Sequence, residues 1–252
     1  MNELRNLNDG RLAFLRRIPL FSEFEDGDFQ EMERLVQLQT VARGSFVYVP
    51  GDAGEQVYLL RSGRVKISKS TPEGKEWILT LVEPGEMFGE MALTGEETRQ
   101  TSAEAVEDSV LASLRREHFL WLAGRKPTLA LRLLRVVGDR RRQMETRVEW
   151  VLFAGVYRRL VELLLDLGKR YGVPVAEGLA LRVQLSQKEI AHLIGSTRET
   201  TSSTLNQLRR QGLIFIHRRR LIIRNVDDLE RAGRGAATLK SATVAPLTTA
   251  RR

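Results

Sequence analysis

Two short helical patterns separated by one glycine constrain this chain more than any other feature. The segment SQKEIAHLIGSTRETTSSTLNQLRRQGLI begins at Ser186. Ser186 and Glu189 have capping-box spacing, and Ser196 and Glu199 repeat it, so we expect a helix to begin after each serine. Gly195 supplies the positive φ that a tight turn between two helices needs. The segment therefore predicts a helix–turn–helix.

The apolar positions of this segment fit two packed helices. Ile190, Leu193 and Ile194 share one face of the first helix, and Leu205 and Leu208 anchor the second helix to it. In a DNA-binding helix–turn–helix, the second helix lies in the major groove and uses its N-terminal residues on base edges. The alternative is a helical hairpin with polar caps.

The charge of the chain is concentrated in the same half. Residues 151–252 hold 18 Lys and Arg against 8 Asp and Glu, whereas residues 1–150 hold 22 against 24. A basic half can be a solvated surface, but it also fits a polyanionic partner. Together with the caps and the glycine, it favours double-stranded DNA as the partner.

The start of the second helix carries side chains suited to base edges. Arg198 can donate two hydrogen bonds to guanine, and Glu199 can accept one from cytosine N4. The residues that follow, 200–203, are short enough to let the backbone approach the groove. Phosphate contacts would set the register of the protein on DNA. The candidates for them are Ser186, Lys188, Thr197, Thr200 and His217.

The N-terminal half consists of short alternating runs separated by Gly, Pro and Asp, which predicts a small β-barrel or roll. Val57 and Leu59 precede Gly63, and Val65 and Ile67 follow it. This spacing predicts a hairpin.

Helical periodicity begins at Pro127, a residue suited to the first turn of a helix. Alternating spacings of three and four form a seam, which predicts pairing with a second copy of the helix. The alternative is packing within the same chain, which the run of arginines at 140–142 disfavours. The seam consists of Leu134, Val137, Arg141, Met144, Val148 and Val151.

The C-terminal part contains three further patterns. A core helix is expected from Val156 to about Arg170, and LIFIHRRRLIIRNV predicts a hairpin with a basic tip. The sequence after Arg231 is small, polar and aperiodic, so we expect disorder there.

Segments from both halves of the sequence resemble a known family. IGSTRETTSSTLNQLRRQGLI resembles the recognition unit of the Crp/Fnr family of transcription regulators. VPGDAGEQVYLLRSGRVKI and EPGEMFGEMAL resemble the cyclic-nucleotide-binding β-roll that precedes it. The resemblance covers about residues 14–230 and implies an α+β fold. Its parts are a β-roll at 1–126, a dimerisation helix at 127–152, a winged helix–turn–helix at 153–231 and a tail at 232–252.

The resemblance also implies partners and a ligand. It implies a homodimer that reads a two-fold symmetric DNA site and works with RNA polymerase, controlled by a small effector in the roll. Cyclic AMP is the leading candidate, with Glu90 on the ribose and Arg99 on the phosphate. Another effector, or a roll that needs no ligand, stays open. The candidate effector residues are Gly89, Glu90, Arg99, Gln100, Met144 and Glu145.

Three positions depart from the family's pattern. Gln100 follows Arg99 where the family usually has Ser or Thr and then Ala. Met144 takes the place of a residue that meets the adenine, and a methionine cannot donate to a base edge. Ser203 matches a third base-reading position, where cyclic-AMP receptor proteins usually have Arg. We therefore expect degenerate DNA selection at that base.

The residues that are missing exclude several classes of protein. The chain has no Cys, which excludes disulfides, Fe–S clusters and Cys-based zinc sites. His118, His192 and His217 are scattered, so we expect neither haem, another metal nor a catalytic site, and we predict that the protein is not an enzyme. An enzyme regulatory subunit is the remaining alternative. No apolar run is long enough to span a bilayer and no signal sequence is evident, which predicts a cytoplasmic protein without membrane contact.

Overall fold

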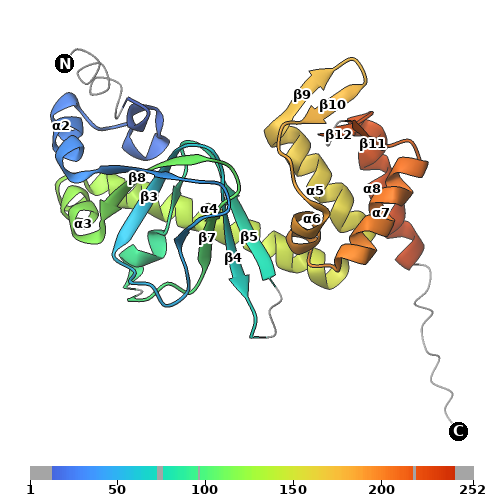
Figure 1. Ribbon diagram of the computed structural model, residues 1–252, viewed down its shortest axis with the longest axis horizontal. Coiled ribbons are helices and arrows are strands. Elements are labelled where there is room, and N and C mark those ends of the chain that lie inside the picture. Colours follow the sequence, from blue (N-terminus) through green and yellow to red (C-terminus); the bar gives the residue numbers. More distant parts are fainter. Residues whose placement is uncertain (1–12, 73–75, 96, 218–219, 242–252) are drawn as a thin grey trace, which may run out of the picture. The chain divides into compact units, whose positions relative to one another are not determined.

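The computed structural model describes residues 13–72, 76–95, 97–217 and 220–241, with side chains described as far as Arg234. The chain divides into two compact units, Met1–Arg142 and Gln143–Arg252 (Figure 1). The boundary lies within helix α4, Pro127–Phe153, which is the long helix that the sequence predicts. Among the described residues, no helix is both long and apolar enough to cross a membrane.

The first unit contains a β-roll made of two four-stranded antiparallel sheets, as the sequence predicts. One sheet has the order β1 (Gln37–Val41), β8 (Ser109–Arg115), β3 (Gln56–Ser62) and β6 (Met87–Phe88). The other has the order β2 (Phe46–Tyr48), β7 (Ser102–Ala105), β4 (Val65–Ser70) and β5 (Glu76–Val82). Both sheets contribute to one core cluster, which includes Tyr48, Leu60, Val65, Phe88 and Leu111.

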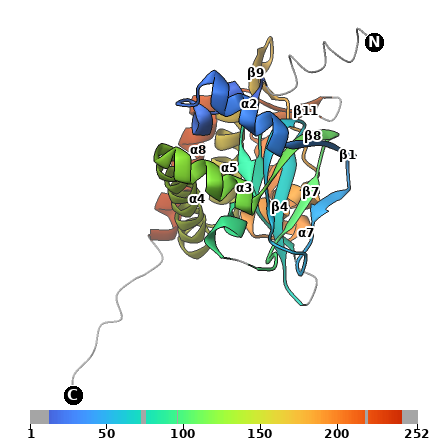
Figure 2. The same ribbon diagram turned by 90° about the vertical axis from the view of Figure 1, so that its left-hand side faces the viewer.

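Helices pack against the first of these sheets. They are η1 (Leu15–Arg17), η2 (Pro19–Phe21), α2 (Asp26–Leu35) and α3 (Arg116–Arg125). Met32 of α2 and Phe119 of α3 are buried in one cluster with Leu59 of β3. Leu129 of α4 joins this cluster, so the start of α4 is anchored to the roll. Figure 2 shows α2 and α3 beside the strands.

The hairpin predicted around Gly63 is wrong. β3 pairs with β6 and β8, whereas β4 pairs with β5 and β7, so the two strands lie in different sheets. The ladder between β3 and β8 is irregular between Leu60 and Ser62. Gly63 has φ +87°, and a β-carbon there would lie 2.3 Å from Ser109 Oγ. The glycine therefore lets the chain cross from one sheet to the other beside β8.

In its described residues, the second unit combines the end of α4 and four further helices with a small sheet. The core helix predicted from Val156 is α5, Val156–Tyr171. The sheet has the order β11 (Ile214–His217), β12 (Arg220–Ile223), β10 (Gly178–Leu181) and β9 (Gly172–Val175). The β11–β12 hairpin confirms the prediction. The β9–β10 hairpin was not predicted, and Pro174 is tolerated because β9 is an edge strand.

The prediction of disorder after Arg231 is partly wrong. Helix α8, Val226–Ser241, continues well past Arg231 and packs along α5. A β-carbon on Gly233 would lie 2.8 Å from Val161 Cγ1, so a small residue allows the two helices to approach closely. Residues 242–252 lie outside the described residues.

The two predicted helices of the helix–turn–helix are α6, Gln187–Ile194, and α7, Arg198–Arg210. The first capping box is confirmed: Ser186 Oγ accepts from Glu189 N (3.2 Å), and Ser186 N donates to Glu189 Oε2 (2.7 Å). Gly195 has φ +60°, as expected.

The second capping box is wrong by one residue. Thr197 is the N-cap of α7, and its Oγ1 accepts from Thr200 N at 3.2 Å. Ser196 belongs to the turn instead, because its backbone N–H closes the turn onto Ala191 O (2.9 Å). Two adjacent residues were both able to cap, and the geometry of the turn selects the second.

The cap assignment predicts different costs for two neighbouring substitutions. Thr197→Ala removes the acceptor for Thr200 N and should lower the free energy of unfolding by about 1 kcal/mol. Ser196→Ala should cost clearly less. Urea unfolding of both full-length variants, followed by far-UV circular dichroism, measures the difference. Equal costs, or a larger cost for Ser196→Ala, would contradict Thr197 as the cap.

Candidate functional site

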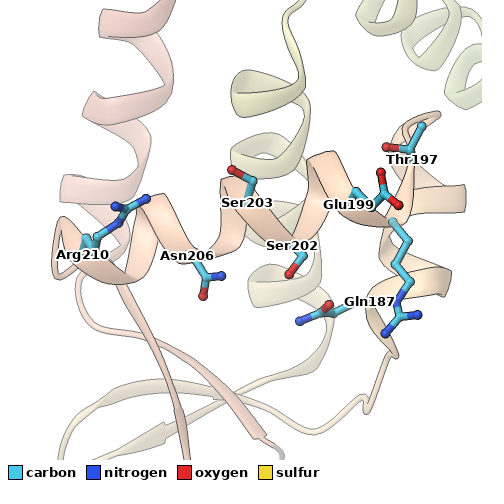
Figure 3. A pocket seen from close by; sticks show the side chains of 8 residues that line it. Gln187, Thr197, Glu199, Ser202, Ser203, Asn206 and Arg210 are labelled. Carbon is cyan, nitrogen blue, oxygen red and sulfur yellow. The ribbon is translucent and has the colours of Figure 1, made fainter.

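An open groove runs along the outer face of α7. The opposite side of this helix is buried, with Thr201, Leu205 and Leu208 at most 2% exposed. The sequence interpretation grouped Thr201 with the short residues that let the backbone approach DNA, but Thr201 packs in the core. Figure 3 shows the residues that line the groove. They are Gln187, Thr197, Arg198, Glu199, Ser202, Ser203, Asn206 and Arg210.

The groove brings together some of the predicted DNA-contacting residues. Those that line it are Thr197, Arg198, Glu199 and Ser203. Those that are exposed but do not line it are Ser186, Lys188, Thr200 and His217. Two of the predicted hydroxyl groups already have roles in the fold, since Ser186 Oγ caps α6 and Thr197 Oγ1 caps α7. A phosphate contact from either hydroxyl would have to form while the same oxygen accepts the capping hydrogen bond.

Sequence reasoning missed three residues of the groove, Gln187, Asn206 and Arg210, and it named Ser202 only as a short residue without a contact of its own. A helical spacing of four relates Arg198, Ser202 and Asn206, and this signal was available in the sequence. Gln187 lies on α6, so the packing of the two helices is what brings it to the groove.

An arginine from a third helix holds the turn between α6 and α7. Arg159 Nη1 of α5 donates to Ile194 O (2.7 Å) and to Gly195 O (3.0 Å). A β-carbon on Gly195 would lie 3.4 Å from Val151 Cγ2 and 3.5 Å from Arg159 Nη1. Burial lowers the pKa of Arg159. The turn is thus fixed by α5 and lies close to the end of α4.

The candidate effector site of the first unit is built around a buried arginine. Arg99 is 2% exposed; its Nη1 donates to Gly89 O (2.9 Å) and its Nη2 to Gln56 O. Its guanidinium lies 4.4 Å from the centroid of the Tyr48 ring. Gly89 has φ +73°, and a β-carbon there would lie 3.1 Å from Arg99 Nη1. The positive φ therefore favours glycine, and a β-carbon would also crowd the guanidinium of Arg99.

Arg99 lacks a negatively charged partner among the described residues. No described carboxylate forms an ion pair with its guanidinium, whose described contacts are with two backbone carbonyls and with aromatic rings. Burial raises the pKa of Tyr48 to about 12, so the phenol beside Arg99 stays neutral at pH 7. Arg99 Nε is buried and has no hydrogen-bond partner in the described structure. The arrangement fits an anion, because a buried charge is costly until it is compensated.

Glu90, the neighbour of Gly89, is already ion-paired. It begins the short helix η3, Glu90–Thr94, and is 8% exposed. Arg140 of α4 binds its carboxylate through Nη1 and donates from Nη2 to Met87 O. Sequence reasoning did not find this contact, which joins α4 to the candidate effector site within the first unit.

The other candidate effector residues lie differently. Gln100 is exposed, and its Nε2 donates to Thr98 O (3.3 Å), so its amide is turned back onto its own loop. Met144 and Glu145 belong to the second compact unit. The structure thus brings together Gly89, Glu90 and Arg99, and it adds Gln56, Tyr48 and Arg140 to them.

Comparison with known proteins identifies both domains. Residues 38–126 match the family model for the cyclic nucleotide-binding domain, and residues 158–232 match that for the Crp-like helix-turn-helix domain. The chain is 32% identical over 223 residues to the CRP-like cAMP-activated global transcriptional regulator of Mycobacterium tuberculosis, a similarity that covers 87% of this chain and 98% of the relative. It is also 32% identical over 219 residues to the cyclic AMP receptor protein of Thermus thermophilus, with the same coverage of 87% and 98%.

A solved structure supports the same assignment. A CRP-family transcriptional regulator from Thermus thermophilus superposes with a TM-score of 0.67 and 27% identity, over 77% of this chain and 96% of that chain. The two domain matches occur in the order that the fold shows, and the relatives are covered almost from end to end. The chain therefore belongs to the Crp/Fnr family of DNA-binding transcription regulators.

Proposed function

We propose that this regulator is a homodimer whose affinity for a two-fold symmetric DNA site is controlled by a cyclic nucleotide in the β-roll. The observation that carries the proposal is Arg99, a buried guanidinium without a carboxylate partner among the described residues. The names of two relatives, one cAMP-activated and one a cyclic AMP receptor protein, support cyclic AMP as the ligand.

On the DNA side, α7 enters the major groove with its N-terminal end. Arg198 donates to guanine O6 and N7, and Glu199 accepts from cytosine N4. Both side chains are exposed and line the groove of the protein along α7. Lys188 and His217 are exposed outside this protein groove, where they contact DNA phosphates and set the register. The protein acts at promoters in the cytoplasm, together with RNA polymerase, and has no enzymatic activity of its own.

The exposed apolar residues of α4 support the homodimer. Leu129 is the only buried residue of this 27-residue helix in the described part of the chain. Leu134 is 66% exposed, Val148 42% and Val151 43%. These residues occupy the seam with alternating spacings of three and four, which is the pattern of paired helices. A second copy of α4 removes this apolar surface from water.

In the roll, Arg99 binds the cyclic phosphate and Glu90 accepts from the ribose 2′-OH. Two carbonyls use one N–H from each terminal nitrogen of Arg99, which leaves its Nε–H and the other two N–H groups for the phosphate. Arg140 already binds Glu90, so it shares this carboxylate with the ribose. The ligand would thereby be linked to α4 through Glu90 and Arg140, and α4 continues to the helix–turn–helix unit.

A regulator that needs no ligand is the second candidate. The ion pair between Glu90 and Arg140 favours it, as do the two carbonyls bound by Arg99, because they satisfy much of the pocket without an effector. Binding of the purified protein to a promoter fragment, with and without cyclic AMP, distinguishes the two candidates. A response to cyclic AMP supports the gated regulator, and equal affinity supports the ligand-independent one.

The base-reading role of Arg198 predicts a local loss of specificity. Arg198→Ala should cost about 1–3 kcal/mol at one guanine of each half-site and relax selection there. Lys188→Ala is the contrast, because a lost phosphate contact weakens binding to all sequences and lowers the salt dependence. DNA selection from a randomised library measures both effects. A full-strength motif from Arg198→Ala would show that Arg198 does not read a base.

The dimer predicts that one charge on the seam separates the two chains. Val148→Asp places a carboxylate against its own copy in the partner, at a cost of several kcal/mol. Gln143→Asp is the matched control, because Gln143 is exposed on the same helix outside the seam. Sedimentation at micromolar concentration should show a dimer for the wild type and the control and a monomer for Val148→Asp. A monomeric wild type contradicts the dimer.

The phosphate-binding role of Arg99 predicts a loss of ligand binding. Arg99→Ala should weaken cyclic AMP binding at least tenfold, since it leaves an anion without its donor. DNA affinity should then lose its dependence on the ligand. Arg43→Ala, at an exposed position of the same unit, is the control. Calorimetry measures binding, and circular dichroism checks that each variant folds.

Calorimetry on the wild type also tests the departure at Met144. Because methionine offers no donor to a base edge, we expect weak discrimination between cyclic AMP and cyclic GMP. Strong rejection of cyclic GMP would contradict this expectation. Binding of neither nucleotide would support the ligand-independent regulator.

A further inference from the structure

We propose that Asn206 is a third base-reading residue and that it selects an adenine in each half-site. The inference rests on the proposed function, in which α7 lies in the major groove. It adds a residue that neither the sequence motif nor the family resemblance assigned.

The position of Asn206 on α7 is the first argument. The buried side of the helix is formed by Thr201, Thr204, Leu205 and Leu208. At 100° per residue, Asn206 lies within about 30° of the direction opposite the centre of that side. It is exposed and lines the groove together with Glu199, which is seven residues earlier. Because seven residues make close to two helical turns, the side chains of Asn206 and Glu199 leave the helix in nearly the same direction.

The neighbours of Asn206 leave its amide accessible. Figure 3 shows the amide projecting from the same side of α7 as Ser202, toward the side where Gln187 of α6 lies. Ser203 and Arg210 project from the other side of the helix. Ser202 is one turn earlier and is too short to reach past Asn206. The amide therefore has an open path away from the helix.

The chemistry of the side chain points to adenine. An amide offers a donor and an acceptor side by side, and these match N7 and N6–H₂ of adenine in the major groove. Arg209 Nη1 donates to Asn206 Oδ1 at 3.4 Å, one turn along α7. This long bond favours one orientation of the amide and leaves the second lone pair of the oxygen for N6–H₂. An amide held in this way is suited to bidentate recognition.

Ser203 cannot supply the same selectivity. A single hydroxyl donates or accepts with any base edge and does not distinguish the four pairs, so the base that it faces is degenerate. Asn206 restores a third selected position. Seven residues span about 10.5 Å of helix, or about three base-pair steps. The adenine is therefore expected about three pairs from the cytosine bound by Glu199.

The experiment is selection from a randomised duplex library with the full-length protein, with saturating cyclic AMP and without it. The variants are Asn206→Ala, Asn206→Asp and, as the matched control, Gln207→Ala. Gln207 is an exposed amide on the same helix, but it does not line the groove. Replacing Asn206 by Ala should leave the helix intact, because the residue is exposed and Ala is the better helix former.

We expect the wild type to select an adenine that Asn206→Ala no longer selects, with a loss of roughly tenfold at that pair alone. Asn206→Asp should shift the preference toward cytosine, whose N4 donates to a carboxylate. Gln207→Ala should keep the wild-type motif. An unchanged motif in Asn206→Ala overturns the proposal, and so does equal weakening on all sequences, which indicates a phosphate contact. If the wild type selects no motif under either condition, the proposed function fails as well.

Discussion

The hydrogen bonds from Arg159 to the last carbonyls of α6 fix the direction of α7, and every proposed base contact depends on that direction. The chain turns at Gly195 within two residues, and the carbonyls of Ile194 and Gly195 would otherwise lack helical partners. Arg159 satisfies both with one nitrogen, from a helix with no residue in the groove. The geometry of the DNA-reading face therefore depends on α5 as well as on α6 and α7.

Arg159 and Arg99 use the same chemistry with different consequences. Each guanidinium donates to two backbone carbonyls, and each has a buried Nε without a partner in the described structure. The acceptors of Arg159 end an α-helix, where the helix dipole is negative and compensates part of the charge. The acceptors of Arg99 lie at the start of strand β3 and at the N-cap of η3, and neither position is the C-terminal end of a helix. This contrast is why we assign a ligand to Arg99 and a positioning role to Arg159.

The sequence predicted the features that depend on local signals. Apolar periodicity located α4 and α5, and the Ser186 cap and Gly195 located the helix–turn–helix. The predictions failed where residues far apart in the sequence determine the structure. β3 and β4 do not pair, because β8 supplies a better partner from far along the chain. The Glu90–Arg140 pair spans 50 residues, and no local pattern indicates it. The start of α8 was predictable, since Asn225 Oδ1 accepts from Asp227 N (2.8 Å) as a cap does.

The continuity of α4 bears on how a ligand could affect DNA binding. A ligand changes an equilibrium only through contacts that differ between the two states. In the first unit Arg140 of α4 binds Glu90 of the candidate effector site, and in the second unit Val151 of α4 lies beside Gly195 in the turn that Arg159 holds. One uninterrupted helix thus contacts the candidate effector site with one residue and the turn before α7 with another. Under the proposed function, a ribose that shares Glu90 with Arg140 changes the restraint on α4. The turn before α7, which Val151 of α4 contacts, then transmits this change to the DNA-reading helix.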